Sequence, residues 1–231
     1  MPTVLITGAS RGIGLALTRV YAEDGWQVLA TCRTPDAADD LQALAKMHGA
    51  IEVEALDVTD ARAIARLAKK VGDRPIDVLF NNAGIMGPRG AQSLGSIDYD
   101  AWQAVLRVNL LAPVAIAQAF ADNVAASERR VIAMMSSTMG SIAEKTSGDY
   151  YLYSTSKAAL NMAVRALAAD LRPRRVIVVA LHPGWVSTDM GGSGASLSPA
   201  RSAPGLKRVV DRLDLDDSGR FRRYDGSEPP W

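Results

Sequence analysis

The sequence is poor in the residues that form covalent cross-links or metal centres. Its 231 residues include one cysteine, Cys32, and two histidines. One cysteine excludes an intramolecular disulfide, and a reducing compartment is expected. No Cys, Asp or Glu lies at metal-ligand spacing from His182, and no G-x-S-x-G sequence occurs. Neither a zinc centre nor an esterase nucleophile is therefore predicted, and both Cys32 and His182 are expected to be structural.

An excess of one charge and long apolar runs are also lacking. The 26 Lys and Arg residues balance 25 Asp and Glu, giving a net charge of +1, which argues against a nucleic-acid binder. No apolar run approaches the roughly 18–20 residues that span a bilayer. The first expected strand begins too early to leave room for a signal peptide. We expect a cytoplasmic protein with no nucleic-acid or membrane partner.

Short apolar runs instead alternate with longer amphipathic stretches. The composition, 48% hydrophobic and 22% charged, excludes disordered, collagen-like and coiled-coil chains. Strands are expected at 3–7, 27–32, 51–56, 76–80, 130–136, 175–181 and 219–224. Helices are expected at 12–24, 36–48, 60–71, 98–125 and 151–171. Repeated β-α-β order predicts an α/β fold: a Rossmann-type doubly wound parallel sheet with helices on both faces, in a single domain over 1–231.

A glycine-rich loop follows the first expected strand. It reads Thr7-Gly8-Ala9-Ser10-Arg11-Gly12-Ile13-Gly14. Gly8 permits a turn with positive φ, while Gly12 and Gly14 allow a pyrophosphate to approach the N-terminus of the next helix. Because ligands of doubly wound sheets bind beyond the carboxyl ends of the strands, the loop predicts a dinucleotide site. The alternative is a tight turn that uses glycine for steric reasons only.

The end of the second expected strand indicates which dinucleotide binds. Arg33 stands where an NAD site usually offers an acidic residue, and Arg11 lies in the glycine loop. The planar donor fork of arginine suits a 2′-phosphate, so NADP(H) is the expected cofactor. The alternative is that both arginines are ordinary surface cations.

Two further loops are expected at the same edge of the sheet. Asp57 and Val58 follow the third strand, where the carboxylate either accepts a hydrogen bond from adenine or forms the turn before the next helix. The run Asn81-Asn82-Ala83-Gly84 follows the fourth strand. It either offers small groups to the adenine ribose or simply forms a turn.

Tyr153 and Lys157 are four residues apart in an expected helix and therefore share one face. A nearby cation favours the phenolate, so Lys157 is expected to lower the pKa of Tyr153 from its ordinary value near 10. Tyr150 and Tyr151 have no lysine four residues later. An ordinary aromatic–cation contact is the alternative for the pair.

Two polar residues are expected to complete this group. Ser137 follows the fifth strand and offers a hydroxyl to a substrate carbonyl, unless it only forms a turn. Asn109 lies four residues before Pro113 in a long expected helix. Because proline has no N–H, the Asn109 carbonyl loses its helical partner and is free to hold a water on a proton path from Lys157. The alternative is an exposed Asn109 in a kinked helix.

Substrate-side residues are expected after the fifth and sixth strands. The run His182-Pro183-Gly184-Trp185-Val186-Ser187-Thr188 turns sharply, and Thr188 is expected to hydrogen-bond the nicotinamide carboxamide. The Gly/Ser-rich stretch 191–198 is expected to form a loop over the site. An apolar pocket is hypothesised from side chains that are equally compatible with core packing: Met86, Met139, Ile142, Tyr150 and Trp185.

Together these motifs resemble the short-chain dehydrogenase/reductase family. The matching segments are TGASRGIG (7–14), DV (57–58), NNAG (81–84), Asn109, Ser137, YSTSK (153–157) and PGWVST (183–188). The segment HPGWVSTDMG and the tail GRFRRYDGSEPPW are similar to the branch with sniffer-type carbonyl reductases and C-factor-like proteins. Only residues 188–199 precede the next helical stretch, a shorter lid than the family often carries, which leaves substrate selectivity open.

The resemblance implies a role for each residue. Tyr153 is the general acid/base, Lys157 lowers its pKa and binds the nicotinamide ribose, Ser137 orients the carbonyl, and Asn109 holds a relay water. The expected cofactor-binding residues, with no metal among the ligands, are Gly8, Ser10, Arg11, Gly12, Ile13, Gly14, Arg33, Asp57, Val58, Asn82, Ala83, Gly84, Tyr153, Lys157, Pro183, Gly184, Val186 and Thr188.

The expected activity is NADPH-dependent reduction of a small-molecule ketone, quinone or aldehyde. The main alternative is an NADP(H)-binding signalling or regulatory module with little turnover. Arg33 disfavours an NAD-dependent oxidation. The helices at 98–125 and 151–171 are able to pair across a homodimer, and the sequence leaves a monomer open as the alternative.

Overall fold

Seven parallel strands form one sheet in the order β3-β2-β1-β4-β5-β6-β7. The computed structural model describes residues 1–231. The strands are β1 (Thr3–Thr7), β2 (Gln27–Cys32), β3 (Ile51–Ala55), β4 (Val78–Asn81), β5 (Val131–Met135), β6 (Ile177–His182) and β7 (Phe221–Arg223). The strand order reverses between β1 and β4, the place where ligands bind in such sheets. The predicted Rossmann-type fold is confirmed.

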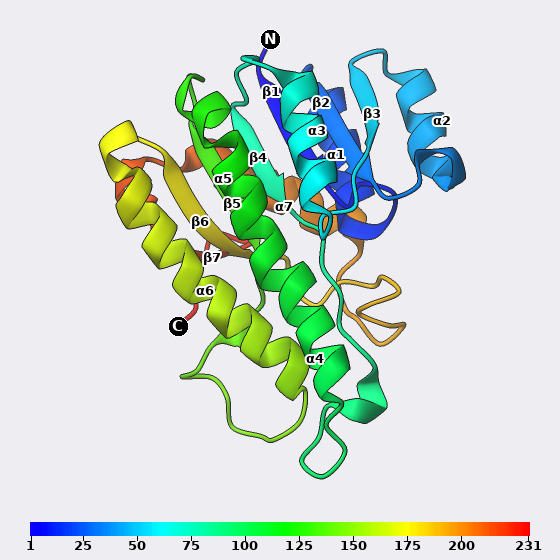
Figure 1. The fold of residues 1–231 in the computed structure, drawn as a ribbon, viewed down its shortest axis with the longest axis vertical. Helices are drawn as coiled ribbons and strands as arrows, with labels where there is room; N and C mark the ends of the chain where they lie inside the picture. Colours follow the sequence, from blue (N-terminus) through cyan, green and yellow to red (C-terminus); the bar gives the residue numbers. More distant parts are fainter.

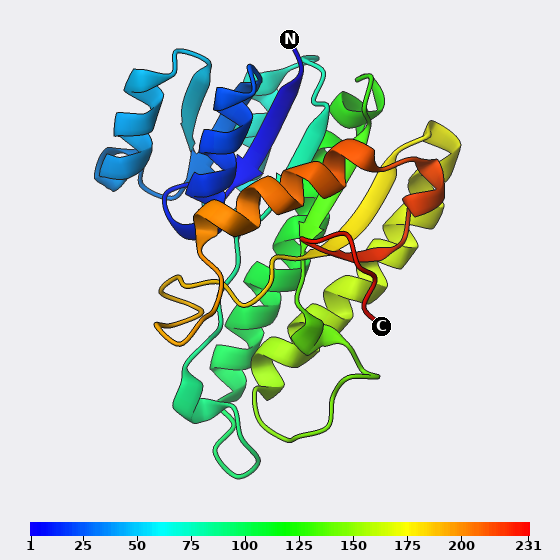
Figure 2. The same cartoon turned by 180° about the vertical axis from the view of Figure 1, so that it is seen from behind.

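Helices cover both faces of the sheet. The α-helices are α1 (Gly12–Glu23), α2 (Asp39–Met47), α3 (Ala61–Val71), α4 (Tyr99–Leu106), α5 (Ala112–Ala125), α6 (Tyr151–Leu171) and α7 (Pro199–Arg212). Figure 1 shows α3, α5 and α6 in front of the sheet. Figure 2 shows α1 and α7 on the opposite face.

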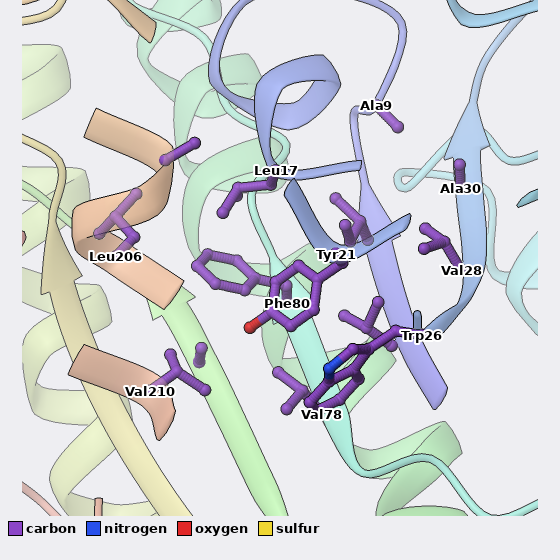
Figure 3. Close-up of a cluster of buried hydrophobic side chains, with 14 of the residues drawn as sticks. Ala9, Leu17, Tyr21, Trp26, Val28, Ala30, Val78, Phe80, Leu206 and Val210 are labelled. Atoms are coloured by element: carbon purple, nitrogen blue, oxygen red, sulfur yellow. The ribbon is translucent and has the colours of Figure 1, made fainter. Parts of the chain in front are cut away.

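Alternate strand residues supply two separate cores. Val4 and Ile6 of β1 belong to the core beneath α1 and α7, whereas Leu5 between them belongs to the core beneath α3, α5 and α6. In the first core, Tyr21 meets Trp26 edge to face at 4.9 Å, near Phe80 and Leu206 (Figure 3). Burial on both faces explains the apolar runs that predicted these strands.

The long helix expected at 98–125 differs from the prediction. A π-helical turn, Arg107–Leu111, joins α4 to α5, and the Ala112 N–H bonds to the carbonyl of Arg107, five residues earlier. Pro113 lacks the N–H that a regular α-helix needs, and the wider turn accommodates this loss within a continuous helix. Asn109 is buried on the inner side of this turn. The alternative of an exposed Asn109 is therefore wrong.

The expectation that no apolar stretch is long enough to span a bilayer was also wrong. The continuous helix Tyr99–Ala125 has 27 residues and a mean hydropathy of 1.6, enough by length and composition alone. Its inner face packs on the sheet, and Ile116, Phe120 and Val124 are core residues. A core helix of a globular domain meets the same criteria.

Candidate active site

The segments after β4, β5 and β6 lie together beyond the carboxyl ends of the strands, at the lower end of Figure 1. Four polar residues are buried at this edge: Asn109, Ser137, Tyr153 and Lys157. Tyr153 and Lys157 lie in the first two turns of α6, with the ammonium 5.6 Å from the centre of the phenol ring. Ser137 follows β5, and its hydroxyl acts on the Tyr153 phenol in the direction that lowers the pKa of the phenol. The structure therefore brings all four predicted residues into one region.

Burial dominates the protonation of this group. The pKa of Tyr153 is raised from 10.0 to about 12, because desolvation of the phenolate outweighs the opposite effect of the Ser137 hydroxyl. This direction is opposite to the sequence-based expectation, which considered the neighbouring charge but not the depth of burial. Desolvation also lowers the pKa of Lys157 from 10.5 to about 8. At neutral pH the phenol is therefore protonated and most of the lysine is charged.

Asn109 joins the long helix to both sides of the site through its side chain. Its Oδ1 accepts from the Ile85 N–H at 2.9 Å, and its Nδ2 donates to the Ile85 carbonyl at 2.8 Å. Nδ2 also donates to the Ser156 hydroxyl at 3.0 Å, one residue before Lys157. Lys157 Nζ donates to the Met135 carbonyl at 2.9 Å, at the end of β5. Asn109 thus holds the segment after β4 against the helix that carries the tyrosine.

The glycine loop is fastened to the loop after β4. The Thr7 hydroxyl accepts from the N–H groups of Asn82 and Ala83 at 3.0 and 3.1 Å. Asn82 Nδ2 in turn donates to the carbonyls of Thr7 and Gly8 at 2.9 and 3.2 Å. These bonds cross the switch point between β1 and β4, so the two loops form one surface.

Close approach explains why Gly14 must lack a side chain. A Cβ on Gly14 would overlap the Gly8 carbonyl oxygen and lie 2.7 Å from Asn82 Nδ2. Gly8 itself has a φ of +68°, which a side chain rarely adopts. Both glycines are therefore required by the geometry of the loop.

The N-terminus of α1 has the donors that a pyrophosphate needs. Its N-cap residue, Arg11, makes no side-chain cap, and the first turn contains no acidic residue. The first N–H groups of a helix carry partial positive charge and favour an anion. Arg33, exposed at the end of β2, forms no ion pair. The residues present therefore fit a phosphorylated dinucleotide.

Two of the predicted cofactor residues have local partners. Arg11 Nη1 lies 2.7 Å from Asp189 Oδ2, so in this structure its charge faces the loop after β6. The expectation was that Arg11 would face the 2′-phosphate site at the end of β2. Asp57 Oδ1 accepts from the N–H and hydroxyl of Thr59 at 2.8 and 2.7 Å, which lowers the pKa of its carboxyl. The turn-forming alternative for Asp57 is thus present, and Oδ2 makes no hydrogen bond in the structure.

The loop after β6 faces the glycine loop. A Cβ on Gly12 would lie 3.2 Å from the Thr188 methyl group. Thr188, a predicted cofactor-binding residue, therefore lies beside the glycine loop. His182 Nδ1 accepts from the Thr138 N–H at 3.4 Å, and burial lowers the pKa of its imidazole to about 4. His182 is therefore neutral at physiological pH, in agreement with a structural role. Buried Cys32 also has a raised pKa, which does not favour a reactive thiolate.

The segment between Ser137 and Tyr153 is held by the C-terminal residues. Trp231 stacks on Phe221 with ring centres 5.4 Å apart, and its carbonyl accepts from the Ala143 N–H at 3.0 Å. Arg223 lies 2.9 Å from Glu144 in the same segment. Residues after α7 thus contact the loop that carries Ile142.

Residues 2–196 match the family model for short chain dehydrogenases. The chain belongs to the short-chain dehydrogenase/reductase family. A protein named C-signal, from Myxococcus xanthus, is 45% identical over 164 residues, which are 71% of this chain and 98% of that protein.

Two solved structures of the family cover this chain completely. The carbonyl reductase Sniffer of D. melanogaster has a TM-score of 0.93 and 35% identity, with 100% of each chain covered. The NADPH-bound carbonyl reductase from chicken fatty liver has a TM-score of 0.92 and 33% identity, over 100% of this chain and 99% of that one. The predicted resemblance to the branch with sniffer-type and C-factor-like proteins is confirmed.

Three residues at this site were not predicted from the sequence. Thr7 was expected only as a member of the glycine loop, although its hydroxyl fastens two loops together. Asp189 pairs with Arg11 across 178 residues, and Gln92 reaches Tyr153 across 61 residues. No local pattern distinguishes an aspartate or a glutamine with such a partner from one in an ordinary loop.

Proposed function

We propose that this short-chain dehydrogenase/reductase is an NADPH-dependent carbonyl reductase that converts a ketone, quinone or aldehyde to an alcohol. The observation that carries the proposal is the buried group of Asn109, Ser137, Tyr153 and Lys157, in which the Lys157 ammonium lies 5.6 Å from the centre of the Tyr153 ring. The two similar solved structures are carbonyl reductases, and one is described as NADPH bound. We place the activity in the cytoplasm.

Several elements would hold the dinucleotide. The glycine loop and the N-terminus of α1 would bind the pyrophosphate, and Arg33 would bind the 2′-phosphate. Asp57, Val58 and the Asn82–Gly84 segment would contact the adenosine, and the Pro183–Thr188 segment with Lys157 would contact the nicotinamide end. When bound, NADPH supplies the hydride that the carbonyl carbon receives.

The residues of the chain bind the carbonyl and supply the proton. Tyr153, protonated at neutral pH with a pKa of about 12, donates its proton to the carbonyl oxygen. The Ser137 hydroxyl donates a hydrogen bond to the same oxygen. The charge of Lys157 favours the phenolate that remains, which reduces the cost of proton release. A water at the Asn109 carbonyl would return a proton from solvent.

Exposed apolar side chains favour an apolar substrate. Ile142 and Trp185 are 79% and 59% exposed, so core packing is excluded as the explanation for either. Met139 lies beside Ser137, because the Met139 N–H donates to the Ser137 hydroxyl oxygen at 3.2 Å. Met86 and Tyr150 are partly exposed on the neighbouring loops. Large apolar carbonyls should therefore be turned over better than small polar ones.

The test is NADPH consumption by the purified protein with a panel of quinones, ketones and aldehydes. Tyr153→Phe should abolish turnover and retain NADPH binding. Tyr151→Phe is the matched control. It also removes a tyrosine hydroxyl, two residues before Tyr153, but Tyr151 has no lysine four residues later. Equal turnover by wild type and Tyr153→Phe would refute the assigned mechanism.

The similarity to C-signal supports a second candidate, an NADP(H)-binding signalling or regulatory module. The same experiment separates the two functions. Tight NADPH binding with no turnover of any carbonyl would favour the module. Turnover that depends on Tyr153 would favour the reductase.

A further inference from the structure

Helix α6, which carries Tyr153 and Lys157, begins without a cap of its own. Its N-cap residue, Tyr150, has a φ of +52° and makes no side-chain cap. The first N–H groups of a helix have no partner within the helix and need acceptors from elsewhere. Tyr153 is the third residue of α6, so its own N–H is one of these groups.

Gln92, in the loop between β4 and α4, supplies the missing acceptors. Its backbone carbonyl accepts from the Tyr151 N–H at 3.1 Å, and its side-chain Oε1 accepts from the Tyr153 N–H at 3.2 Å. The other end of the amide, Nε2, donates to the Met86 carbonyl at 3.0 Å. Gln92 is only 1% exposed, so water does not replace these bonds.

The contact at Met86 extends this connection to the cofactor side of the site. Met86 lies two residues after Gly84, where an added Cβ would be 3.6 Å from Lys157 Nζ. Asn109 holds the residue between them, Ile85, by two hydrogen bonds. The segment 84–86 is therefore fixed to α6 from two directions.

We propose that Gln92 is a positioning residue that sets Tyr153 at a fixed place relative to segment 84–86. The inference rests on the proposed function, because the position of the phenol matters only if Tyr153 transfers a proton. A small displacement of a reacting group lowers the rate far more than it lowers substrate affinity.

The first test is Gln92→Met, which keeps the length of the side chain and removes its two side-chain hydrogen bonds, to the Tyr153 N–H and to the Met86 carbonyl. Asn123→Leu is the matched control. Asn123 is also buried and donates from Nδ2 to the carbonyls of Gly72 and Arg74 at 2.6 and 2.9 Å, in the segment that precedes β4 and thus at the edge of the sheet opposite to the site. Both variants should lose stability. Only Gln92→Met should lower kcat, by about ten- to a hundredfold, with the carbonyl KM changed less than about threefold.

Gln92→Glu gives a second, independent measurement. A neutral carboxylic acid has one donor and one acceptor and is able to replace the amide, whereas a carboxylate has acceptors only and faces the Met86 carbonyl. Turnover of Gln92→Glu should therefore be close to wild type at low pH and fall relative to wild type as the pH rises. Gln92→Met should show no such recovery.

Amide hydrogen exchange provides a readout that does not depend on turnover. Exchange at the Tyr153 N–H should accelerate in Gln92→Met and remain at the wild-type rate in Asn123→Leu. The proposal is overturned if kcat of Gln92→Met falls no more than that of Asn123→Leu, or if exchange at Tyr153 is unchanged. Wild-type protein without carbonyl turnover would refute the proposed function instead, and the exchange result would then decide whether Gln92 holds Tyr153.

Discussion

The guanidinium of Arg11 lies 2.7 Å from the carboxylate of Asp189, and this ion pair joins the glycine loop to the segment after β6. The two side chains are 73% and 75% exposed. Solvent screens such a pair, so its contribution to stability is at most about 1 kcal/mol. The ion pair therefore opens readily, and we expect it to affect the selectivity between NADPH and NADH.

Asp189→Asn should increase the preference for NADPH over NADH. The substitution releases Arg11, which no longer has to break an ion pair before it approaches a 2′-phosphate. A pair worth up to about 1 kcal/mol corresponds to NADPH binding that is up to about fivefold tighter, with NADH unchanged. Fluorescence titration of both cofactors measures the ratio. Equal weakening of both would show that Asp189 holds the loop and does not compete for Arg11.

Arg33→Ala should weaken NADPH binding by roughly 10- to 100-fold, the cost of losing hydrogen bonds to a charged group. NADH affinity should stay within about twofold, since NADH lacks the 2′-phosphate. Arg208→Ala is the matched control, because Arg208 is exposed on α7 and forms no ion pair. A parallel loss of affinity for both cofactors, or the same loss in the control, would contradict the assignment.

The buried ammonium of Lys157 should make stability rise with pH. Its pKa is about 8 in the folded chain and near 10.5 when unfolded, so between these values the unfolded chain holds the additional proton. The free energy of unfolding therefore increases with pH, by about 3 kcal/mol at full extent. The raised pKa of Tyr153 acts in the opposite direction only above about pH 10.

Urea unfolding of wild type and Lys157→Met from pH 7 to pH 10 tests this prediction. The difference between the two proteins cancels the contribution of Cys32, whose raised pKa lowers stability above about pH 9. The rise should be present in wild type and absent in the variant. Identical slopes would mean that Lys157 is hydrated in solution.

Gly14→Ala should destabilise the fold by about 3 kcal/mol or more and abolish NADPH binding, because the new methyl group overlaps the Gly8 carbonyl oxygen. Gly49→Ala is the control. Gly49 has no neighbour within 4 Å of an added Cβ, and its φ is not positive. The free energy of unfolding of Gly49→Ala should differ from that of wild type by no more than about 0.5 kcal/mol. Full NADPH affinity in Gly14→Ala would refute the close approach.

Most of the fold and the four buried polar residues were predictable, because strand runs, glycine spacing and the Tyr153–Lys157 interval are local patterns. Contacts between distant segments were not. The π-helical turn before Pro113, the Arg11–Asp189 pair and the Gln92 contacts all depend on how the elements pack. The direction of the Tyr153 pKa was missed for the same reason, since a neighbouring lysine is visible in the sequence and the depth of burial is not.

The contact between Trp231 and Ala143 has a consequence for the order in which the two sides of the site are completed. The glycine loop and the Asn82–Gly84 segment lie in the first 84 residues and fasten to each other. The substrate-side segment that contains Ile142 gains its Trp231 and Arg223 contacts only when β7 is in place beside β6. During synthesis from the N-terminus, the two loops at the pyrophosphate and adenosine end are therefore made well before the C-terminal residues that complete the substrate side.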